Sequence, residues 1–349
     1  LAVKHGAYVA MVNQVGGNDS LVFDGSSVVI RPDGRVVARA ASFAEDLIYF
    51  DTQDGAAVLR ESATEGPTDG VAEMWQALVL GTRDYVRKCG FSKALIGLSG
   101  GIDSALVAAI AVEALGAENV VGVGMPSEYS SLGSIEDARR LAKNLGVRFE
   151  LLPIHDVFAQ YRKVLEPLFA GTPFGLAEEN LQSRIRGALL MALSNKFGAL
   201  VLTTGNKSEM STGYCTLYGD MVGALAVIGD VMKTRVYALS RYVNQRREVI
   251  PWETIQKPPS AELRPEQRDT DSLPPYDVLD PILEAYVERY CSAEQIAEEQ
   301  TVDVGLVWSV IQLVERSEYK RQQAALVLKV TRKSFGMGRR FPIAVKVQV

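Results

Sequence analysis

The chain has 349 residues, enough for about two domains with a sizeable core. Its hydrophobic content of 47% and charged content of 23% are those of an ordinary globular protein, and its net charge of −5 argues against a general nucleic-acid binder. Three scattered cysteines are too few for a disulfide framework or a zinc site. No apolar run reaches the roughly 18 residues of a membrane span, so we expect a cytoplasmic protein with no membrane partner.

The first part of the chain, residues 1–52, is typical of β structure. The apolar run at 7–15 predicts one strand, and 23–40 predicts two strands joined by a turn at Pro32-Asp33-Gly34. Residues 53–70 are rich in glycine, small and acidic residues, and they predict a linker. Because strand-like sequence starts at once, we expect the chain to be the later part of a longer protein.

Residues 71–349 predict a second domain of the α/β class. After a helix at 71–90, strands and helices alternate, which is typical of a doubly wound parallel sheet with helices on both faces. The expected strands are 94–98, 119–125, 147–154 and 199–205, and the expected helices are 103–115, 134–145, 155–170 and 178–197. Ser134 and Asp137 fit a capping box at the start of the helix at 134–145.

The last third of the chain divides into three segments. Residues 252–276 are rich in proline and predict a long functional loop rather than a helix or strand. Helices are expected over 277–319. From Arg316 to Val349 there are nine lysines and arginines against one acid, Glu318. This basic tail has three interpretations, a solvated face, a nucleic-acid arm, or a clamp for phosphates and carboxylates.

A glycine loop stands between the strand at 94–98 and the helix at 103–115, where the sequence reads ALIGLSGGIDSALVAAI. A strand, a glycine turn and a helix N-terminus together form a natural anion site, although the glycines alone also fit a plain tight turn. Neither the Walker A pattern nor the Rossmann pattern is present. Since a carboxylate beside phosphates would be repelled, Asp103 makes sense chiefly as a Mg²⁺ ligand. The loop therefore predicts a site for a pyrophosphate group.

The sequence SGGIDS at 99–104 resembles the pyrophosphatase loop of the N-type ATP pyrophosphatases, which share an adenine nucleotide alpha hydrolase-like fold. That superfamily splits ATP between the α and β phosphates and transfers AMP to a substrate oxygen. Later segments resemble the NAD⁺ synthetases, in the form found in glutamine-dependent bacterial enzymes. These segments are MPSEYSSLGSIEDA (125–138), ENLQSRIRG (179–187), TTGNKSEMSTGYCTLYGDM (203–221), KTRVYAL (233–239), PPSAELRPEQRDTDSLPPYDVLD (258–280) and FGMGRRFPI (335–343).

The resemblance implies a set of site residues. ATP is expected at Ser99, Gly100, Gly101, Asp103, Ser104, Thr204, Lys233 and Ser260, and Mg²⁺ at Asp103 and Glu209. Deamido-NAD⁺ is expected at Asn180, Arg184, Tyr214, Tyr218, Asp220, Lys320 and Arg321. By themselves, Glu209 would be a helix-start charge and Lys233 a surface lysine. After Lys320 and Arg321 the chain departs from the family's usual Ala-Pro, yet an anionic dinucleotide explains the basic tail better than nucleic acid does.

Residues 1–52 resemble the closing strands of a nitrilase-type glutaminase domain, most clearly in NQVGGNDSLVFDG at 13–25. Such a domain releases ammonia from glutamine with a Glu-Lys-Cys triad. No cysteine precedes Cys89 in this chain, so we expect no glutaminase catalytic residue here. Ammonia would then be supplied directly, or by glutamine hydrolysis in a full-length protein. The family also implies a homodimer or a higher homo-oligomer.

The implied reaction is the ATP-dependent amidation of deamido-NAD⁺ through an adenylated intermediate, giving NAD⁺, AMP and pyrophosphate. Histidine catalysis is not expected, because His5 and His155 lie outside every motif. Two alternatives remain. One is another amidating or thiolating member of the superfamily, such as GMP synthetase. The other is a nucleotide-binding module that senses ATP without turnover, against which Asp103, Glu209 and Lys233 argue.

Overall fold

A six-stranded sheet forms the centre of the structure, a computed structural model that describes residues 1–52, 57–58, 70–336 and 338–344. Every neighbouring pair of its strands is parallel. In order across the sheet the strands are β10 (Arg148–Leu151), β9 (Val120–Gly124), β8 (Ala94–Gly97), β11 (Leu200–Thr203), β12 (Leu225–Ala226) and β13 (Leu326–Val327). The chain thus forms β8, β9 and β10 in one direction across the sheet. It then returns to the other side of β8 and forms β11, β12 and β13 in the opposite direction. The predicted doubly wound parallel sheet is confirmed.

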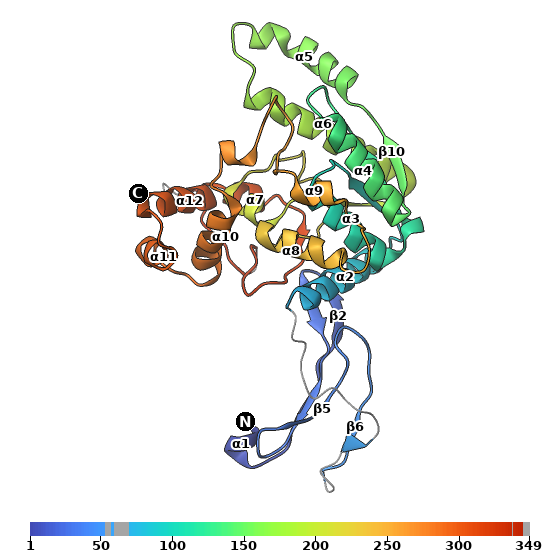
Figure 1. Ribbon diagram of the computed structural model, residues 1–349, viewed down its shortest axis with the longest axis vertical. Helices are drawn as coiled ribbons and strands as arrows, with labels where there is room; N and C mark the ends of the chain where they lie inside the picture. Colours follow the sequence, from blue (N-terminus) through green and yellow to red (C-terminus); the bar gives the residue numbers. More distant parts are fainter. Residues whose placement is uncertain (53–56, 59–69, 337, 345–349) are drawn as a thin grey trace.

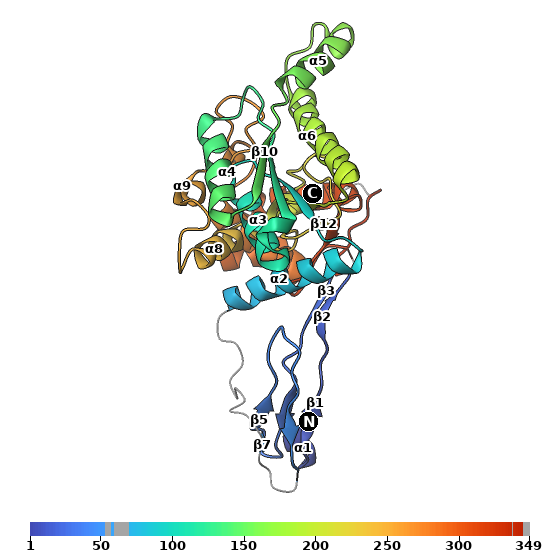
Figure 2. The same ribbon diagram turned by 90° about the vertical axis from the view of Figure 1, so that its right-hand side faces the viewer.

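Helices cover both faces of this sheet (Figures 1 and 2). One face is packed against α2 (Gly70–Lys88), α3 (Ile102–Leu115), α4 (Leu132–Leu145) and α8 (Lys233–Val243), and the other against α5 (His155–Phe169) and α6 (Leu176–Phe197). Leu95 of β8 packs with Ile185 of α6, whereas its neighbour Ile96 packs with Leu106 of α3. Because successive residues of a strand point to opposite faces, a strand covered on both sides must be apolar throughout, as β8 is.

The sheet reverses its winding between β8 and β11. The chain leaves β8 through α3 toward β9 on one side, and it leaves β11 through α7 (Lys207–Thr212) toward β12 on the other. Connections that diverge in this way open a crevice at the carboxyl ends of the two central strands, where doubly wound sheets bind their ligands. The glycine loop follows β8, and the segment from Thr204 to Glu209 follows β11, so both border that crevice.

A helical region completes the body beyond β12. Its elements are α9 (Trp252–Gln256), the 3₁₀ turn η2 (Asp269–Asp271), α10 (Tyr276–Leu283), the π-helical turn η3 (Glu284–Glu288), α11 (Ala293–Gln300), α12 (Val304–Arg316) and α13 (Glu318–Arg321). The remaining 3₁₀ turn, η1 (Ala117–Asn119), precedes β9. Helices α10 and α12 share a separate apolar core with residues that include Met232 and Phe335. Among the described residues no helix is both long and apolar enough to cross a membrane.

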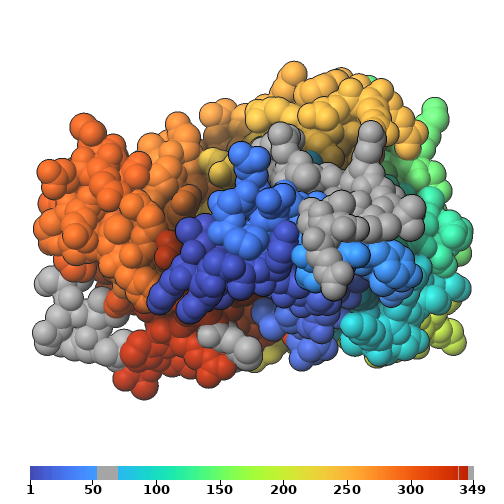
Figure 3. All heavy atoms as spheres, turned by 90° about the horizontal axis from the view of Figure 1, so that it is seen from below, coloured from blue at the N-terminus to red at the C-terminus, as the bar shows by residue number. Residues whose placement is uncertain are grey.

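The N-terminal residues form a slender β arm that projects from the body (Figures 1 and 2). It contains α1 (Ala2–His5), a sheet of β1 (Val9–Met11), β4 (Val28–Ile30) and β5 (Val36–Arg39), a hairpin of β2 (Val15–Asn18) and β3 (Leu21–Asp24), and the pair β6 (Tyr49–Phe50) and β7 (Ala57–Val58). Viewed end-on from below, the arm lies in front of the body (Figure 3). The hairpin is held on α2, where Asp84 accepts a hydrogen bond of 2.8 Å from the Gly17 amide.

Several sequence predictions need correction. The expected strand at 7–15 is two strands, β1 and β2, because the chain changes partner between them. Helix α4 begins at Leu132, so its capping residue is Ser131, whose hydroxyl accepts a hydrogen bond from the Ser134 amide. Residues 252–256 form α9 rather than loop. The strands β12 and β13 were not predicted, because two residues are too few to show the periodicity of a strand. Of the predicted linker at 53–70, all but 57, 58 and 70 lie outside the described residues.

The position of α3 in the core leads to a stability prediction. Leu106 is completely buried between the sheet and the helices. We expect Leu106→Ala to lower the free energy of unfolding by about 2–5 kcal/mol, since it removes apolar contacts and leaves a cavity. The same substitution at Leu132, which is 85% exposed, should change it by no more than about 0.5 kcal/mol. Urea denaturation monitored by circular dichroism measures both, and equal losses would contradict the assigned core.

Candidate active site

The glycine loop is packed tightly against the first turn of α4. Gly100 has φ of 80°, and a Cβ atom there would lie 2.2 Å from the carbonyl oxygen of Ser134, so only glycine fits. The loop is closed by its own hydroxyls, since Ser104 donates to the Gly101 carbonyl at 3.0 Å and the Gly101 amide donates to Ser99 Oγ at 3.2 Å. No side chain caps the N-terminus of α3. Its positive end is therefore available to an anion.

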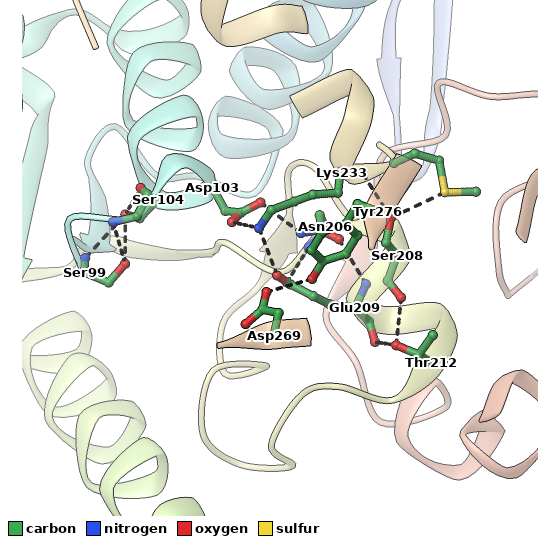
Figure 4. Close-up of polar contacts among 12 residues, drawn as sticks. Ser99, Asp103, Ser104, Asn206, Ser208, Glu209, Thr212, Lys233, Asp269 and Tyr276 are labelled. Carbon is green, nitrogen blue, oxygen red and sulfur yellow. Dashed lines mark hydrogen bonds and ion pairs between the residues drawn. The ribbon is translucent and has the colours of Figure 1, made fainter. Parts of the chain in front are cut away.

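Three charged side chains meet beside this loop (Figure 4). Lys233, at the start of α8, places its Nζ atom 2.6 Å from Asp103 Oδ2 and 3.4 Å from Glu209 Oε1. Asn206 donates from its Nδ2 atom to Asp103 Oδ1 at 2.9 Å, and its Oδ1 atom caps α7 by accepting from the Glu209 amide. Asp103 follows β8 and Glu209 follows β11, so the cluster joins the two central strands across the crevice.

The electrostatics of the cluster follow from its burial. Burial, together with the nearby Asp103, raises the pKa of Glu209 above its usual range. Burial alone would lower the pKa of Lys233, but Asp103 and Glu209 outweigh it and raise that pKa. Asp269 adds a third carboxyl, and burial raises its pKa as well. Three carboxyl groups thus face one ammonium group, and an additional cation would be electrostatically favoured.

The donor set suits a magnesium ion. Mg²⁺ prefers oxygen ligands, and in nucleotide sites it is held by one or two carboxylates, with phosphates and water completing the shell. Asp103 and Glu209 provide two such carboxylates. Across the described residues, no group of three or more His, Cys, Asp or Glu side chains is arranged to hold a metal by itself. The residues therefore fit a metal that arrives with phosphates better than a permanently bound one.

A cavity covers the cluster. Its wall includes ten of the predicted residues, of which nine are Ser99, Gly101, Asp103, Ser104, Thr204, Glu209, Tyr214, Asp220 and Lys233. Ser260 also lines it, from the proline-rich segment. A second cavity adjoins the first, and both are bordered by Ser99, Thr204 and Asp220. Residues predicted from separate motifs therefore come together around one continuous space.

The second cavity has apolar walls and a half-buried arginine, Arg186. Leu98, Val123 and Phe149 contribute to the walls. Arg186 of α6 donates from Nε to the carbonyl oxygen of Met125 at 2.9 Å, and burial lowers its pKa to about 10, so it stays protonated at neutral pH. A flat aromatic group with polar edges suits such a space. Sequence reasoning missed Arg186, because within ENLQSRIRG nothing distinguishes it from Arg184.

Several residues predicted for deamido-NAD⁺ lie behind the loop at 213–220 rather than on the cavity wall. Asn180 accepts a hydrogen bond of 2.8 Å from Thr216, and Arg184 donates to the Leu217 carbonyl at 3.2 Å. Lys320 donates to the carbonyl oxygens of Gly213 and Cys215 at 2.7 and 2.8 Å. Tyr218 is exposed and donates to Gln323. In this conformation these side chains support the loop from which Tyr214 and Asp220 reach the cavity.

Arg321 is not brought to the cavity. Its guanidinium is buried, pairs with Glu318 at 2.9 Å, and donates to the carbonyl oxygens of Met210, Ser211 and Val314. It also lies over the Phe335 ring at 4.4 Å. The hydrogen bonds to Met210 and Ser211 hold α13 against the end of α7. The structure thus gives Arg321 a role inside the fold, and its contact with substrate stays a prediction.

The proline-rich segment crosses the cavity and is fastened to α4. Glu262 has φ of 49°, an uncommon conformation for a residue other than glycine. Its carboxylate accepts from Ser134 Oγ at 2.6 Å and from Ser131 Oγ at 3.1 Å. Lys257 donates to Ser134 at 2.9 Å and pairs with Asp137 at 3.2 Å. Ser134 and Asp137, predicted as a capping box, are thus anchors for the segment at 257–268. No sequence pattern predicts contacts between residues so distant along the chain.

Cys215 also lies at the cavity. Burial, followed by the influence of Asp220, raises the pKa of its thiol to about 12. The nucleophilic form of cysteine is the thiolate, which is scarce at neutral pH in such surroundings. Burial therefore opposes a role for Cys215 as a nucleophile.

Two family models match the chain. The model described as NAD synthase matches residues 74–324, and the model described as carbon-nitrogen hydrolase matches residues 1–60. The chain is 57% identical over 339 residues to a glutamine-dependent NAD(+) synthetase of Synechocystis sp., covering 95% of this chain and 60% of that protein. It is 49% identical over 345 residues to one of Acinetobacter baylyi, covering 98% and 64%. The chain thus spans less than two thirds of the length of these relatives.

Solved structures agree with this likeness. The glutamine-dependent NAD⁺ synthetase from Acinetobacter baumannii, solved in complex with ADP, is 47% identical, with a TM-score of 0.71 and coverage of 98% of this chain and 62% of that one. The NH₃-dependent NAD synthetase from Campylobacter jejuni is 27% identical, with a TM-score of 0.59 and coverage of 72% and 96%.

Asp220 gives the site a testable pH dependence. Its side chain is exposed toward the cavity, yet desolvation of the carboxyl by the surrounding protein raises its pKa to about 6, against hydrogen bonds from Thr216 and Ser183 and the charge of Lys320. A carboxyl whose pKa is higher in the folded state binds more protons there, so stability falls as the pH rises from its unfolded pKa of about 3.9 to about 6. Asp220→Asn removes this loss.

We therefore expect Asp220→Asn to be slightly more stable than the wild type at pH 7.5, a small effect because solvent screens the exposed side chain, and the advantage to disappear below about pH 4. Urea denaturation at pH 4 and pH 7.5 measures the difference. The exposed Asp33→Asn on the arm serves as control. An advantage of equal size at both pH values would contradict the raised pKa.

Proposed function

The chain belongs to the NAD synthase family, and on that premise we propose that it catalyses the ATP-dependent amidation of deamido-NAD⁺. The carboxylate of the nicotinate ring attacks the α-phosphate of ATP, pyrophosphate leaves, and ammonia displaces AMP from the adenylate to give NAD⁺. The observation that carries the proposal is the meeting of Asp103, Glu209 and Lys233 beside a glycine loop, at the carboxyl ends of two central strands. A carboxylate is unreactive toward amines, so adenylation is needed to provide a good leaving group.

The residues around the first cavity have separate tasks in this reaction. The backbone of Ser99, Gly100 and Gly101 and the N-terminus of α3 bind the pyrophosphate part of ATP, and Ser104 holds the loop closed. Asp103 and Glu209 would hold Mg²⁺, which supplies charge neutralisation for the departing pyrophosphate. Lys233 donates to the phosphate oxygens, where negative charge develops. Catalysis then consists of positioning and electrostatic stabilisation more than of acid–base chemistry.

The two adjoining cavities divide the substrates between them. The adenosine of ATP fits the apolar second cavity, with Arg186 at its base and Thr204 at the border with the first. Deamido-NAD⁺ enters from the side of Tyr214 and Asp220, where an aromatic ring and a carboxyl suit stacking and hydrogen bonding to the nicotinate end. Ser260 belongs to the segment that covers both, and closure of this segment excludes water from the adenylate.

Four further residues contribute to the deamido-NAD⁺ site by supporting or belonging to the loop at 213–220. Asn180, Arg184 and Lys320 fix its backbone and neighbours, and Tyr218 is the exposed member of the group. The cytoplasm is the proposed compartment, supported by Cys89, Cys215 and Cys291, all of which are free thiols.

The proposed reaction is tested by incubating the chain with ATP, Mg²⁺ and deamido-NAD⁺ and supplying either ammonium or glutamine. We expect NAD⁺ and AMP with ammonium and no product with glutamine, because no cysteine precedes Cys89 in this chain to act as a glutaminase nucleophile. Asp103→Asn and Glu209→Gln should each lower the rate by about 100-fold or more. The exposed Asp33→Asn and Glu294→Gln are matched controls and should retain full activity.

Other outcomes have distinct meanings. AMP formed only with a different acceptor nucleotide would indicate another amidating or thiolating enzyme. Tight ATP binding without release of pyrophosphate, whatever the acceptor, would indicate a nucleotide sensor. Full activity in Asp103→Asn would contradict the assigned metal site.

We also propose that two copies of the chain associate through α5. Val157, Tyr161, Val164 and Leu168 recur at helical spacing and are all exposed, forming an apolar stripe along the helix. Helix α5 stands at the rim of the body, away from the arm (Figures 1 and 2). An exposed apolar stripe of this kind is typical of a protein–protein interface.

Light scattering tests this association. The wild type should have about twice the chain mass of 38.0 kDa, or a higher multiple. Val164→Glu with Leu168→Glu should shift it to a single chain, since two buried charges would destabilise an apolar interface. Leu132→Glu, an equally exposed leucine on α4, is the control. An unchanged mass in the double variant would contradict α5 as the interface.

A further inference from the structure

A second buried lysine lies close to the site but faces away from it. The Nζ atom of Lys207 lies 2.8 Å from Asp230 Oδ1, 2.6 Å from Glu288 Oε1, 2.8 Å from Thr331 Oγ1 and 2.7 Å from the Lys333 carbonyl oxygen. Lys207 is completely buried, and none of these five residues lines either cavity. The reaction proposed above makes no use of them.

This cluster joins four segments that are far apart in the chain. Lys207 begins α7, Asp230 follows β12, Glu288 closes the π-helical turn η3, and Thr331 follows β13. Asp230 also accepts from the amides of Val330 and Thr331 at 2.9 and 2.8 Å. Every charge is therefore hydrogen-bonded. Since burying ions is costly and gives little net stability, such a cluster is better explained by the geometry it specifies than by stability.

The element that Lys207 anchors is too short to hold itself in place. Helix α7 has six residues, whereas isolated helices below roughly 12 residues are marginal in water. Its first turn nevertheless carries two groups of the site, Asn206 and Glu209, on either side of Lys207 in the sequence. Ser208 adds a second anchor through a hydrogen bond of 2.6 Å to Asp280. The contacts of Lys207 and Ser208 outside the cavity thus fix the position of Glu209 relative to Asp103.

We propose that Lys207 is a positioning residue for the metal site. Its ion cluster with Asp230, Glu288 and Thr331 holds α7 so that Glu209 and Asn206 keep their places opposite Asp103. The segment after β13 therefore contributes to the site without touching substrate. The part of this inference that concerns Mg²⁺ rests on the proposed function, whereas the anchoring of α7 does not.

The test uses the mildest change in the cluster. Thr331→Val removes the hydroxyl that bonds both Lys207 and Asp230 but keeps the side-chain volume. Thr331→Ser retains the hydroxyl and should behave like the wild type. Glu288→Gln is a second variant that removes one charge. Asn244→Ala is the matched control, because Asn244 is also buried and bonds the backbone of Val249 and Ile250, away from both cavities.

Two measurements separate positioning from stability alone. The first is amide hydrogen exchange over residues 204–213 without ligand, and the second is the Mg²⁺ concentration needed for ATP binding, by calorimetric titration without acceptor. In Thr331→Val and Glu288→Gln we expect faster exchange in this segment and an approximately tenfold higher Mg²⁺ requirement. Thr331→Ser should show neither, and Asn244→Ala should lose stability with neither effect.

Exchange and Mg²⁺ requirement that change no more in Thr331→Val than in Asn244→Ala would overturn the proposal. So would faster exchange in the two variants with an unchanged Mg²⁺ requirement. A wild type that binds no ATP would count against the proposed function instead. In that case the exchange data, which need no ligand, would still decide whether the cluster anchors α7.

Discussion

One ammonium group shared by two carboxylates is the interaction on which the geometry of the site depends. Asp103 and Glu209 stand at the ends of β8 and β11, where the two halves of the sheet diverge. Without Lys233 the two carboxylates would repel each other across the crevice, and loss of one partner from a buried ion pair typically costs about 3–5 kcal/mol. Lys233 also begins α8, so its position follows from the packing of that helix on the sheet. The fold therefore determines the spacing of the carboxylates before any ligand binds.

The two buried lysines of this region show how similar charges serve different purposes. Lys207 is enclosed by four oxygen atoms and faces no cavity. Lys233 lines a cavity and shares it with carboxyl groups that outnumber it. A buried ion cluster in which every charge is paired has no place for a further ion. A cluster with excess negative charge and access to solvent can accept a cation and its phosphates. Helix α7 carries Lys207 on one side and Glu209 on the other, and so connects the two clusters.

The sequence predicted those parts of the site that depend on the regular fold. The alternation of strands and helices after residue 71 predicted a parallel sheet, and the carboxyl ends of parallel strands lie at one edge of a sheet. The sheet placed Asp103 at this edge, whereas the pairing of Asp103 with Glu209 was implied by the family resemblance. Asn206 was missed although it adjoins the same motif, because nothing in the sequence tells which oxygen an amide side chain faces. The burial of Arg321 was not predicted, since a basic residue in a basic tail carries no mark of burial.

Ser134 illustrates a further limit of sequence patterns and a link within the site. The prediction took its hydroxyl for a helix cap, yet the cap is Ser131, and the hydroxyl of Ser134 is free to donate to Glu262 of the covering segment. The carbonyl of the same residue lies directly beneath Gly100. The covering segment and the glycine loop therefore both contact Ser134, one through its hydroxyl and the other through its backbone. Movement of the segment off Ser134 would release the hydroxyl of a residue against which the glycine loop is packed.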